Sequence, residues 1–256
     1  MDYLPVFLDL AGRGVLVVGG GTVAMRKVEL LLAAGARVRV VAPALLPELA
    51  AHRDAARIEY LAAPFEPRHL DSMVLAIAAT DRREVNHAVA AAGAARGLFV
   101  NVVDDAELSS CIMPAIIDRS PVIVAVSTSG RSPALAHRLR AQLEAFLPGR
   151  LGELALLAGR LRERVRQALP DGRQRRRFWE RLFAGNVVNQ VLAGQAEAAE
   201  ALAQAQLEAA RAPDHGADGD GDGGGAGSGR GEVYLIGAGP GDPELLKRRA
   251  QQLLQQ

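Results

Sequence analysis

The residues of this sequence that could do chemistry include a pair of carboxylates, Asp104 and Asp105, which follow the apolar run LFVNVV. If that run is a strand of an open α/β sheet, both aspartates leave its carboxyl end, where ligands bind in such sheets. A carboxylate at that edge can accept the proton that accompanies hydride loss. From the residues alone, Asp104 is either such a base or the cap of a turn, whereas Asp105 is expected to cap a turn.

A glycine-rich turn lies earlier in the chain, where Gly19, Gly21 and Ala24 form a G-x-G-x-x-A pattern after the apolar run VLVV. The first glycine permits the turn, the second lets a pyrophosphate approach the backbone, and the small third residue lets a helix pack on the strand. The helix N-terminus adds free N–H groups and a partial positive charge. The pattern predicts dinucleotide binding, with a turn that serves only packing as the alternative.

The second apolar run, RVRVVAP, lacks the acidic residue that usually holds the cofactor ribose, because Ala42 and Pro43 stand at its end. Backbone groups near Pro43 and Ala44 must then recognise the ribose. No arginine follows to pair with a 2′-phosphate, so the sequence favours NAD over NADP.

A third group, STSGRSP, joins hydroxyls and a guanidinium at the start of a predicted helix. Thr128, Ser129 and Arg131 could hold a carboxylate or phosphate there, although an ordinary turn with Ser132 as N-cap fits equally well. The five histidines are scattered and Cys111 is the single cysteine, so we predict no resident metal site.

The elements that position these residues follow from the apolar pattern. Residues 1–113 predict an open, doubly wound α/β domain of Rossmann type, with strands over 57–62 and 73–78 and a helix capped by Asp81. Runs over 112–117 and 122–127 predict a hairpin within a small α+β region, 114–148, and residues 149–211 predict an α-helical subdomain broken at 170–172 and 184–186. Residues 212–231 predict a flexible linker, and residues 232–256 the start of another domain.

Charge and composition limit the partners. The formal net charge is +1, which favours neither nucleic acid nor a membrane surface as a partner. No apolar run is long enough to span a bilayer, and a single cysteine excludes an internal disulfide. We therefore predict a cytoplasmic protein.

Several stretches together resemble one family, bacterial siroheme synthase, over residues 1 to about 205: the N-terminal run through RVRVVAP, then LAIAATD, NVVDD, CIMPAIIDRSPVIVAVSTSGRSPALA and RRRFWERLF. The run GEVYLIGAGPGDPELL resembles the opening of that family's uroporphyrinogen III methyltransferase domain. The resemblance implies NAD-dependent oxidation of precorrin-2 to sirohydrochlorin, followed by insertion of ferrous iron to give siroheme. It also implies a homodimer built through residues 112–148.

The resemblance implies a role for individual residues as well. Asp104 matches the base assigned to both steps. The family's contacts to NAD map to Thr22, Val23, Pro43 and Ala44, and Pro240 matches a contact to S-adenosyl-L-methionine in full-length members. The implied substrate is a polycarboxylate, which gives Thr128, Ser129 and Arg131 a ligand, and Asn101 is a further candidate contact to substrate. Because the last domain is cut short in this sequence, we expect no methyltransferase activity from it. The alternatives are an NAD-dependent dehydrogenase of a small substrate and an NAD-binding sensor without turnover.

Overall fold

The computed structural model describes residues 1–211, which divide into two units. One unit comprises Met1–Ile116 with Ala125–Arg140, and the other comprises Ile117–Val124 with the described residues from Ala141 onward. The predicted linker, the predicted start of a further domain and Pro240 lie outside the described residues. Among residues 1–211, no helix has the length and apolar character needed to cross a membrane.

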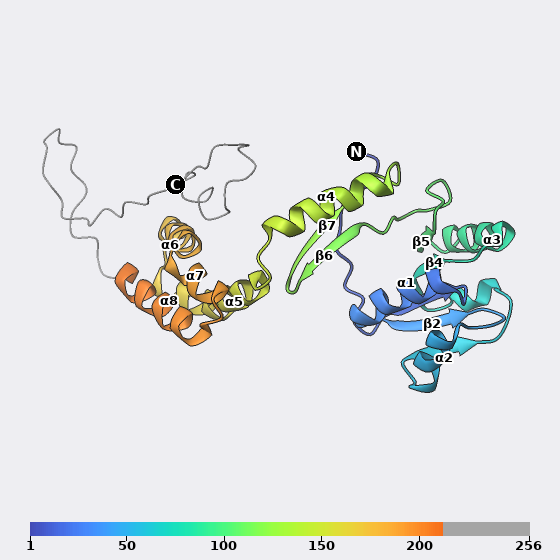
Figure 1. Ribbon diagram of the computed structural model, residues 1–256, viewed down its shortest axis with the longest axis horizontal. Helices are drawn as coiled ribbons and strands as arrows, with labels where there is room; N and C mark the ends of the chain where they lie inside the picture. Colours follow the sequence, from blue (N-terminus) through green and yellow to red (C-terminus); the bar gives the residue numbers. More distant parts are fainter. Residues whose placement is uncertain (212–256) are drawn as a thin grey trace, which may run out of the picture. The chain divides into compact units, whose positions relative to one another are not determined.

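A parallel sheet forms the centre of the first unit (Figure 1). Its strands lie in the order β3-β2-β1-β4-β5, with all four pairings parallel. Their bounds are β1 (Gly14–Val18), β2 (Arg37–Val41), β3 (Ile58–Leu61), β4 (Met73–Ala78) and β5 (Phe99–Val102). This topology confirms the predicted doubly wound sheet. The strand order reverses between β1 and β4, which places the expected ligand crevice at the carboxyl ends of these two strands.

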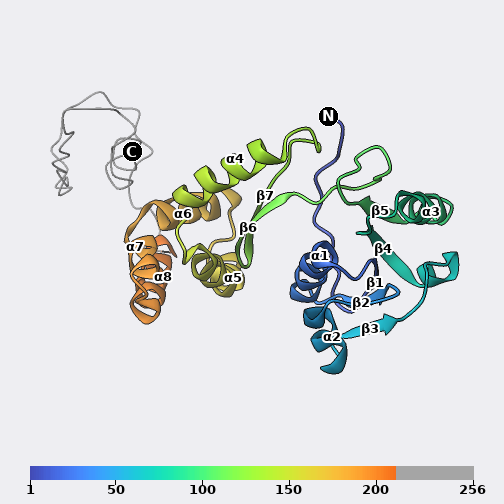
Figure 2. The ribbon, with the colours of Figure 1, turned by 45° about the vertical axis from the view of Figure 1, so that its right-hand side comes forward.

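Helices cover both faces of this sheet (Figure 2). Helices α1 (Thr22–Ala33) and α2 (Pro47–Asp54) pack on one face, in a core that includes Val17 of β1 and Val40 of β2. Helix α3 (Arg83–Ala94) and the 3-10 helix η1 (Pro67–Leu70) pack on the other face. In α1 the residues Ala24, Val28 and Leu31 are buried at helical spacing, so one apolar stripe docks the helix on the sheet.

The start of α3 differs from the sequence prediction. Its N-cap is Arg82 rather than Asp81, and no side chain caps the helix. Instead the hydroxyl of Thr80 accepts a hydrogen bond from the Arg82 N–H at 3.1 Å and donates to Asn86 Oδ1 at 2.9 Å. The prediction that Asp81 caps this helix was wrong, because Thr80 closes the turn one residue earlier.

A two-stranded sheet follows, made of β6 (Ala115–Arg119) and β7 (Val122–Val126). The two-residue connection between the strands requires an antiparallel hairpin. The first strand begins three residues later than residue 112, where it was predicted to begin. The reason is that the Cys111 N–H donates to the Val100 carbonyl at 3.2 Å and Cys111 and Met113 pack against the sheet core, which holds this stretch on the first unit.

Helix α4 (Pro133–Phe146) begins where the sequence predicts it, after Ser132. The Ser132 hydroxyl accepts the Leu135 N–H at 3.3 Å, which satisfies one of the free donors of the first turn. The Arg140 side chain donates to the Ile116 carbonyl at 2.9 Å, and Arg119 pairs with Glu144 at 3.3 Å. These bonds hold α4 along the hairpin.

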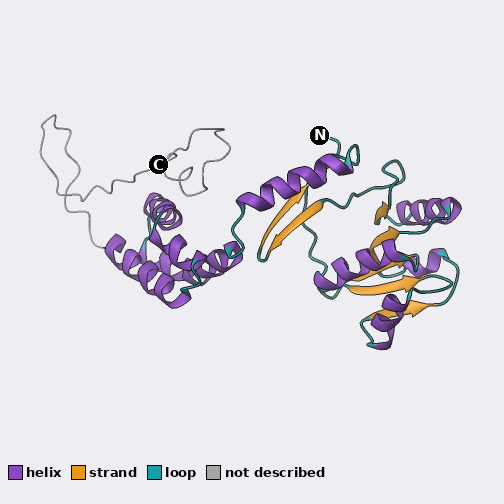
Figure 3. Ribbon diagram, viewed as in Figure 1, coloured by secondary structure: helices purple, strands orange, loops and turns teal. Residues whose placement is uncertain are grey.

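The second unit is mainly helical (Figure 3). It contains α5 (Leu151–Ala168), α6 (Gly172–Ala184), α7 (Asn186–Leu192) and α8 (Ala196–Arg211) around one apolar core. The predicted breaks before Gly172 and at Gly185 are present. A further break at Gly194, which has φ 81°, separates α7 from α8 and was not predicted.

Candidate functional site

The glycine turn after β1 is tightly packed on two sides and open on the third. A Cβ added at Gly19, where φ is 131°, would lie 2.2 Å from the Ala79 carbonyl oxygen that follows β4. A Cβ added at Gly20 would lie 1.9 Å from the Ala44 carbonyl oxygen that follows β2. At Gly21, by contrast, an added Cβ would meet nothing within 4 Å. Gly19 and Gly20 therefore allow the ends of β1, β2 and β4 to approach one another, and Gly21 faces open space.

That open space lies at the N-terminus of α1. Gly21 is the N-cap, no side chain bonds to the first-turn N–H groups, and the first turn carries no acidic residue. Thr22 and Val23 follow at exposed positions. Free N–H groups without a competing carboxylate are what a pyrophosphate requires at a helix N-terminus.

The turn after β2 is bonded to the same glycine loop. The Leu46 N–H donates to the Gly20 carbonyl at 2.9 Å, and the Gly19 N–H donates to the Val41 carbonyl at 3.0 Å. Pro43 and Ala44 lie between these two bonds in the chain. The structure thus brings together the six residues predicted to contact NAD: Gly19, Gly21, Thr22, Val23, Pro43 and Ala44. Their arrangement fits a dinucleotide.

The two aspartates after β5 differ in their surroundings. Asp105 Oδ1 accepts the Leu108 N–H at 3.1 Å, which confirms that Asp105 caps a turn. Asp104 is exposed, and no group among residues 1–211 forms a hydrogen bond or contact ion pair with its carboxylate. Its backbone is left-handed, with φ 61°. A carboxylate without a structural partner at a strand end is available to a ligand.

The segment after Asp105 folds back on β5 and covers the free edge of the sheet. The Ser109 hydroxyl accepts the Val102 N–H at 2.9 Å and donates to the Asp105 carbonyl at 2.6 Å. The Ser110 hydroxyl accepts the Val100 N–H at 2.8 Å. Two serines therefore satisfy edge donors that would otherwise be free, and they fix the turn that carries Asp104.

Asn101, predicted to contact substrate, is buried on β5, and its Nδ2 donates to the Cys111 carbonyl at 3.1 Å. This bond is a structural one, and the predicted contact to substrate stays a prediction. Cys111 itself is half-buried, and burial raises the pKa of its thiol to about 11. The thiol is therefore protonated at neutral pH.

The turn of Thr128, Ser129 and Arg131 lies beside the Asp104 turn. A Cβ added at Gly130 would lie 3.3 Å from the Cβ of Ala106, and the Tyr3 hydroxyl donates to the Ala106 carbonyl at 3.5 Å. The Thr128 hydroxyl bonds to the Ser132 backbone at both N–H and carbonyl, and Arg131 pairs with Asp2 at 3.2 Å. The structure therefore brings these predicted ligand contacts to one end of the first unit together with Asp104.

Backbone strain marks the same place. Four residues other than glycine have positive φ among residues 1–211, namely Ala56, Ser72, Asp104 and Ser129. Two of the four are predicted site residues. Left-handed residues other than glycine cost about 1–3 kcal/mol and cluster at functional sites. The coincidence supports a functional reason for both turns.

The structure adds two groups to this edge that the sequence reading did not single out. Ala79 and Thr80 follow β4 and pack against Gly19, and the rule that ligands bind at the carboxyl ends of strands could have identified them. Lys27 on α1 is half-buried, and the charge of Asp104 acts on it. No sequence pattern pointed to Lys27.

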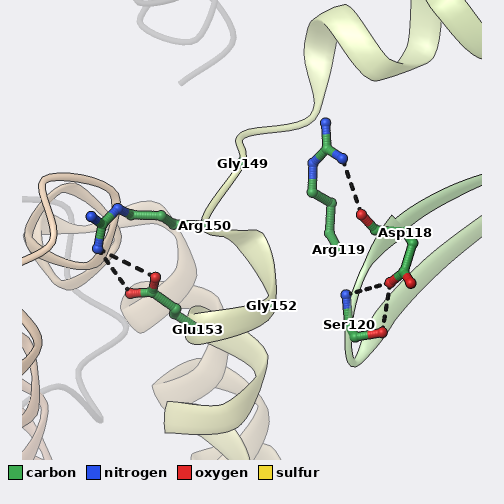
Figure 4. Close-up of a pocket in the computed structure, with 7 residues that line it drawn as sticks. All are labelled: Asp118, Arg119, Ser120, Gly149, Arg150, Gly152 and Glu153. Atoms are coloured by element: carbon green, nitrogen blue, oxygen red, sulfur yellow. Dashed lines mark hydrogen bonds and ion pairs between the residues drawn. The ribbon is translucent and has the colours of Figure 1, made fainter. Parts of the chain in front are cut away.

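A separate pocket of about 410 Å³ lies in the second unit, between the hairpin turn and the start of α5 (Figure 4). Its charged groups pair locally: Arg150 with Glu153 at 3.3 Å, and Arg119 with Glu144 at 3.3 Å. None of the predicted site residues lines it. Among residues 1–211 no three histidine, cysteine or acidic side chains gather as metal ligands.

An open parallel sheet with a glycine turn at its switch point defines a dinucleotide-binding protein of Rossmann type. Comparison with family profiles agrees: residues 6–115 match an NAD(P)-binding family. Residues 120–145 match the sirohaem biosynthesis protein central region, and residues 150–207 match the sirohaem synthase dimerisation region. The dimerisation profile thus covers α5 to α8, whereas the resemblance assigned dimerisation to residues 112–148.

Curated relatives match the whole chain. It is 48% identical over 256 residues to the siroheme synthase of Methylobacillus flagellatus and 50% identical over 257 residues to siroheme synthase 1 of Aeromonas salmonicida. The chain is therefore similar over its whole length to siroheme synthases. It spans about half the length of these relatives, 52% of each.

One solved structure shares the fold. A precorrin-2 dehydrogenase, SirC, superposes with a TM-score of 0.62 and 23% sequence identity, over 81% of this chain and all of that one.

Proposed function

We propose that this chain oxidises precorrin-2 to sirohydrochlorin with NAD and then inserts ferrous iron into the product to give siroheme. The similarity to siroheme synthases and the fold shared with a precorrin-2 dehydrogenase support this choice of substrate. The observation that carries the proposal is the meeting of three features at one end of the first unit: the open glycine turn, the unpaired Asp104 carboxylate and the Thr128 turn beside it.

In the first step, bound NAD supplies the acceptor for the hydride that leaves the substrate. The chain itself supplies the binding groups and the base. The α1 N–H groups and the Pro43–Ala44 backbone hold the cofactor, and Asp104 takes up the proton released with the hydride. No structural bond has to break first, because the Asp104 carboxylate has no partner among residues 1–211.

In the second step, ferrous iron enters the ring as a substrate, and two ring N–H protons must leave. The same carboxylate serves as their acceptor, which explains how one site could catalyse both reactions. The substrate is a polycarboxylate, and the hydroxyls of Thr128 and Ser129 together with Arg131 are its proposed contacts. Arg131 is 80% exposed, so its pairing with Asp2 is weak enough to exchange for a ligand carboxylate.

We also propose that the protein is a homodimer, with α4 in the contact. Four large apolar residues of α4 share one helix face and are all exposed: Leu135, Leu139, Leu143 and Phe146. A stripe of this kind is typical of a face that another chain covers. The resemblance assigned dimerisation to a region that includes α4, and the dimerisation profile covers the helices that follow it, at residues 150–207.

The test of the activity is an anaerobic assay of precorrin-2 with NAD that follows NADH and the tetrapyrrole spectrum. The variant is Asp104→Asn, because asparagine tolerates the left-handed backbone that alanine would strain. The matched control is Asp105→Asn, which makes the same charge change one residue away.

We expect Asp104→Asn to lower kcat by about 10²- to 10⁴-fold and Asp105→Asn to retain most of it. Equal losses in both variants would move the base away from Asp104. If the wild-type protein bound NAD but did not oxidise precorrin-2, the proposed enzymatic activity would be refuted and the NAD-binding sensor would be favoured.

A further inference from the structure

The loop that follows β4 lies between the two parts of the candidate site. In the strand order β3-β2-β1-β4-β5, β4 separates β1, which leads into the glycine turn, from β5, which leads into the Asp104 turn. A dinucleotide at such a switch point places one mononucleotide over each half of the sheet. The adenosine half is expected over β1 and β2, where the Pro43–Ala44 backbone lies, so the nicotinamide half extends over the end of β4.

This loop is in close contact with the glycine turn. A Cβ added at Gly19 would lie 2.2 Å from the Ala79 carbonyl oxygen and 3.5 Å from Cγ2 of Thr80. The Ala79 N–H donates to the Val18 carbonyl at 2.8 Å, which ties the start of the loop to the end of β1. Any shift of the loop would therefore change the shape of the cofactor site.

Asn86, in the first turn of α3, holds the loop in place. Its Nδ2 donates to the Thr80 carbonyl at 3.0 Å, and its Oδ1 accepts a hydrogen bond from the Thr80 hydroxyl at 2.9 Å. The same hydroxyl accepts the Arg82 N–H at 3.1 Å. One half-buried amide therefore binds both the backbone and the side chain of Thr80.

These bonds leave two backbone donors available to a ligand. Among residues 1–211, no group accepts a hydrogen bond from the N–H of Thr80 or of Asp81. A carbonyl and the N–H that follows it share one rigid peptide plane. Packing of the Ala79 carbonyl against Gly19 therefore orients the Thr80 N–H, and the bond from Asn86 to the Thr80 carbonyl orients the Asp81 N–H.

We propose that Asn86 is a positioning residue for NAD, which holds the loop after β4 so that its two free N–H groups bind the nicotinamide half of the cofactor. The inference deepens the proposed function and rests on it for the identity of the cofactor. Without Asn86, the Thr80–Asp81 peptide can rotate. The nicotinamide half then loses an oriented contact, whereas the adenosine half keeps its contacts at the glycine turn.

The first test compares NAD with ADP, which lacks the nicotinamide and its ribose, by calorimetric titration of the full chain. Asn86→Leu keeps a side chain of similar size and removes both hydrogen bonds. We expect it to weaken NAD binding about five- to tenfold and ADP binding less than about twofold. His87→Ala, at the next residue, is exposed and serves as the control, which should bind both nucleotides as the wild type does.

Two variants of Thr80 test the same bonds from the other side. Thr80→Ser keeps the hydroxyl and should bind NAD like the wild type, whereas Thr80→Val removes the hydroxyl and should weaken NAD more than ADP. Thermal melting identifies the variants that fold. Equal weakening of NAD and ADP would show a merely structural role, and unchanged NAD binding in both Asn86→Leu and Thr80→Val would show that the clamp is not needed. Either result would overturn the proposal.

The second test follows oxidation of precorrin-2 as NAD is varied. Asn86→Leu should raise KM for NAD by about the factor found in the titration, and Thr80→Ser should not. Absence of turnover in the wild type would refute the proposed function, and the comparison of NAD with ADP would still decide the role of Asn86.

Discussion

A pair of adjacent glycine substitutions separates the two tasks of the turn after β1. Gly20 and Gly21 are neighbours, but an added Cβ would lie 1.9 Å from the Ala44 carbonyl oxygen at Gly20 and would meet nothing within 4 Å at Gly21. Gly20→Ala therefore pushes against backbone, whereas Gly21→Ala projects into the space where a pyrophosphate would approach.

The magnitudes follow from these contacts. Forcing a methyl group against packed structure costs about 1–3 kcal/mol, and Gly20→Ala should reach the upper part of that range because a carbonyl of the Ala44 turn must move. Gly21 has φ −94°, which alanine adopts freely, and its change removes only a favourable N-cap at a cost under about 1 kcal/mol. A methyl group that blocks close approach should weaken NAD binding at least about tenfold, which is 1.4 kcal/mol.

Calorimetric titration with NAD and urea unfolding measure both quantities on the same samples. The expected pattern is a destabilised Gly20→Ala and a stable Gly21→Ala with poor affinity. If Gly21→Ala bound NAD as tightly as the wild type, the cofactor would not lie over this turn, and the turn would serve packing alone.

Three further predictions concern groups around the site. Burial raises the pKa of the Cys111 thiol from its ordinary 9.0 to about 11, so between these pH values the unfolded state loses the proton and the folded state keeps it. The free energy of unfolding should therefore fall as pH rises through this range. Cys111→Ala should flatten that decline, as measured by urea unfolding at several pH values. Ser109→Ala leaves the Val102 N–H without its partner and should cost about 1–2 kcal/mol in urea unfolding, and an unchanged midpoint would show that water replaces the hydroxyl. Leu139→Glu charges the exposed stripe of α4 and should yield monomers by light scattering, whereas Ala141→Glu, which adds the same charge at an exposed position on the opposite side of the helix, should leave a dimer.

The sheet and its glycine turn could be predicted because short-range rules govern them. Apolar runs alternating with helical patterns determine a doubly wound sheet, and the spacing of Gly19 and Gly21 depends on the turn alone. Ser132 was correctly predicted as an N-cap for the same reason.

Features set by tertiary contacts could not be predicted. The late start of β6 depends on Cys111 packing against the sheet core, and the start of α3 depends on Thr80 closing a turn that Asp81 was expected to cap. The edge that positions Asp104 likewise depends on serines several residues further along the chain.

The left-handed backbone at Asp104 and Ser129 lowers the stability of the folded chain at two positions that the proposed activity needs. Each of these residues costs the folded chain about 1–3 kcal/mol, which asparagine or glycine would partly recover. The substitutions that remove the proposed base and the proposed substrate contact are therefore among those that should raise the melting temperature. A search for more thermostable versions of this chain, if guided by melting alone, would tend to select inactive proteins at these two positions.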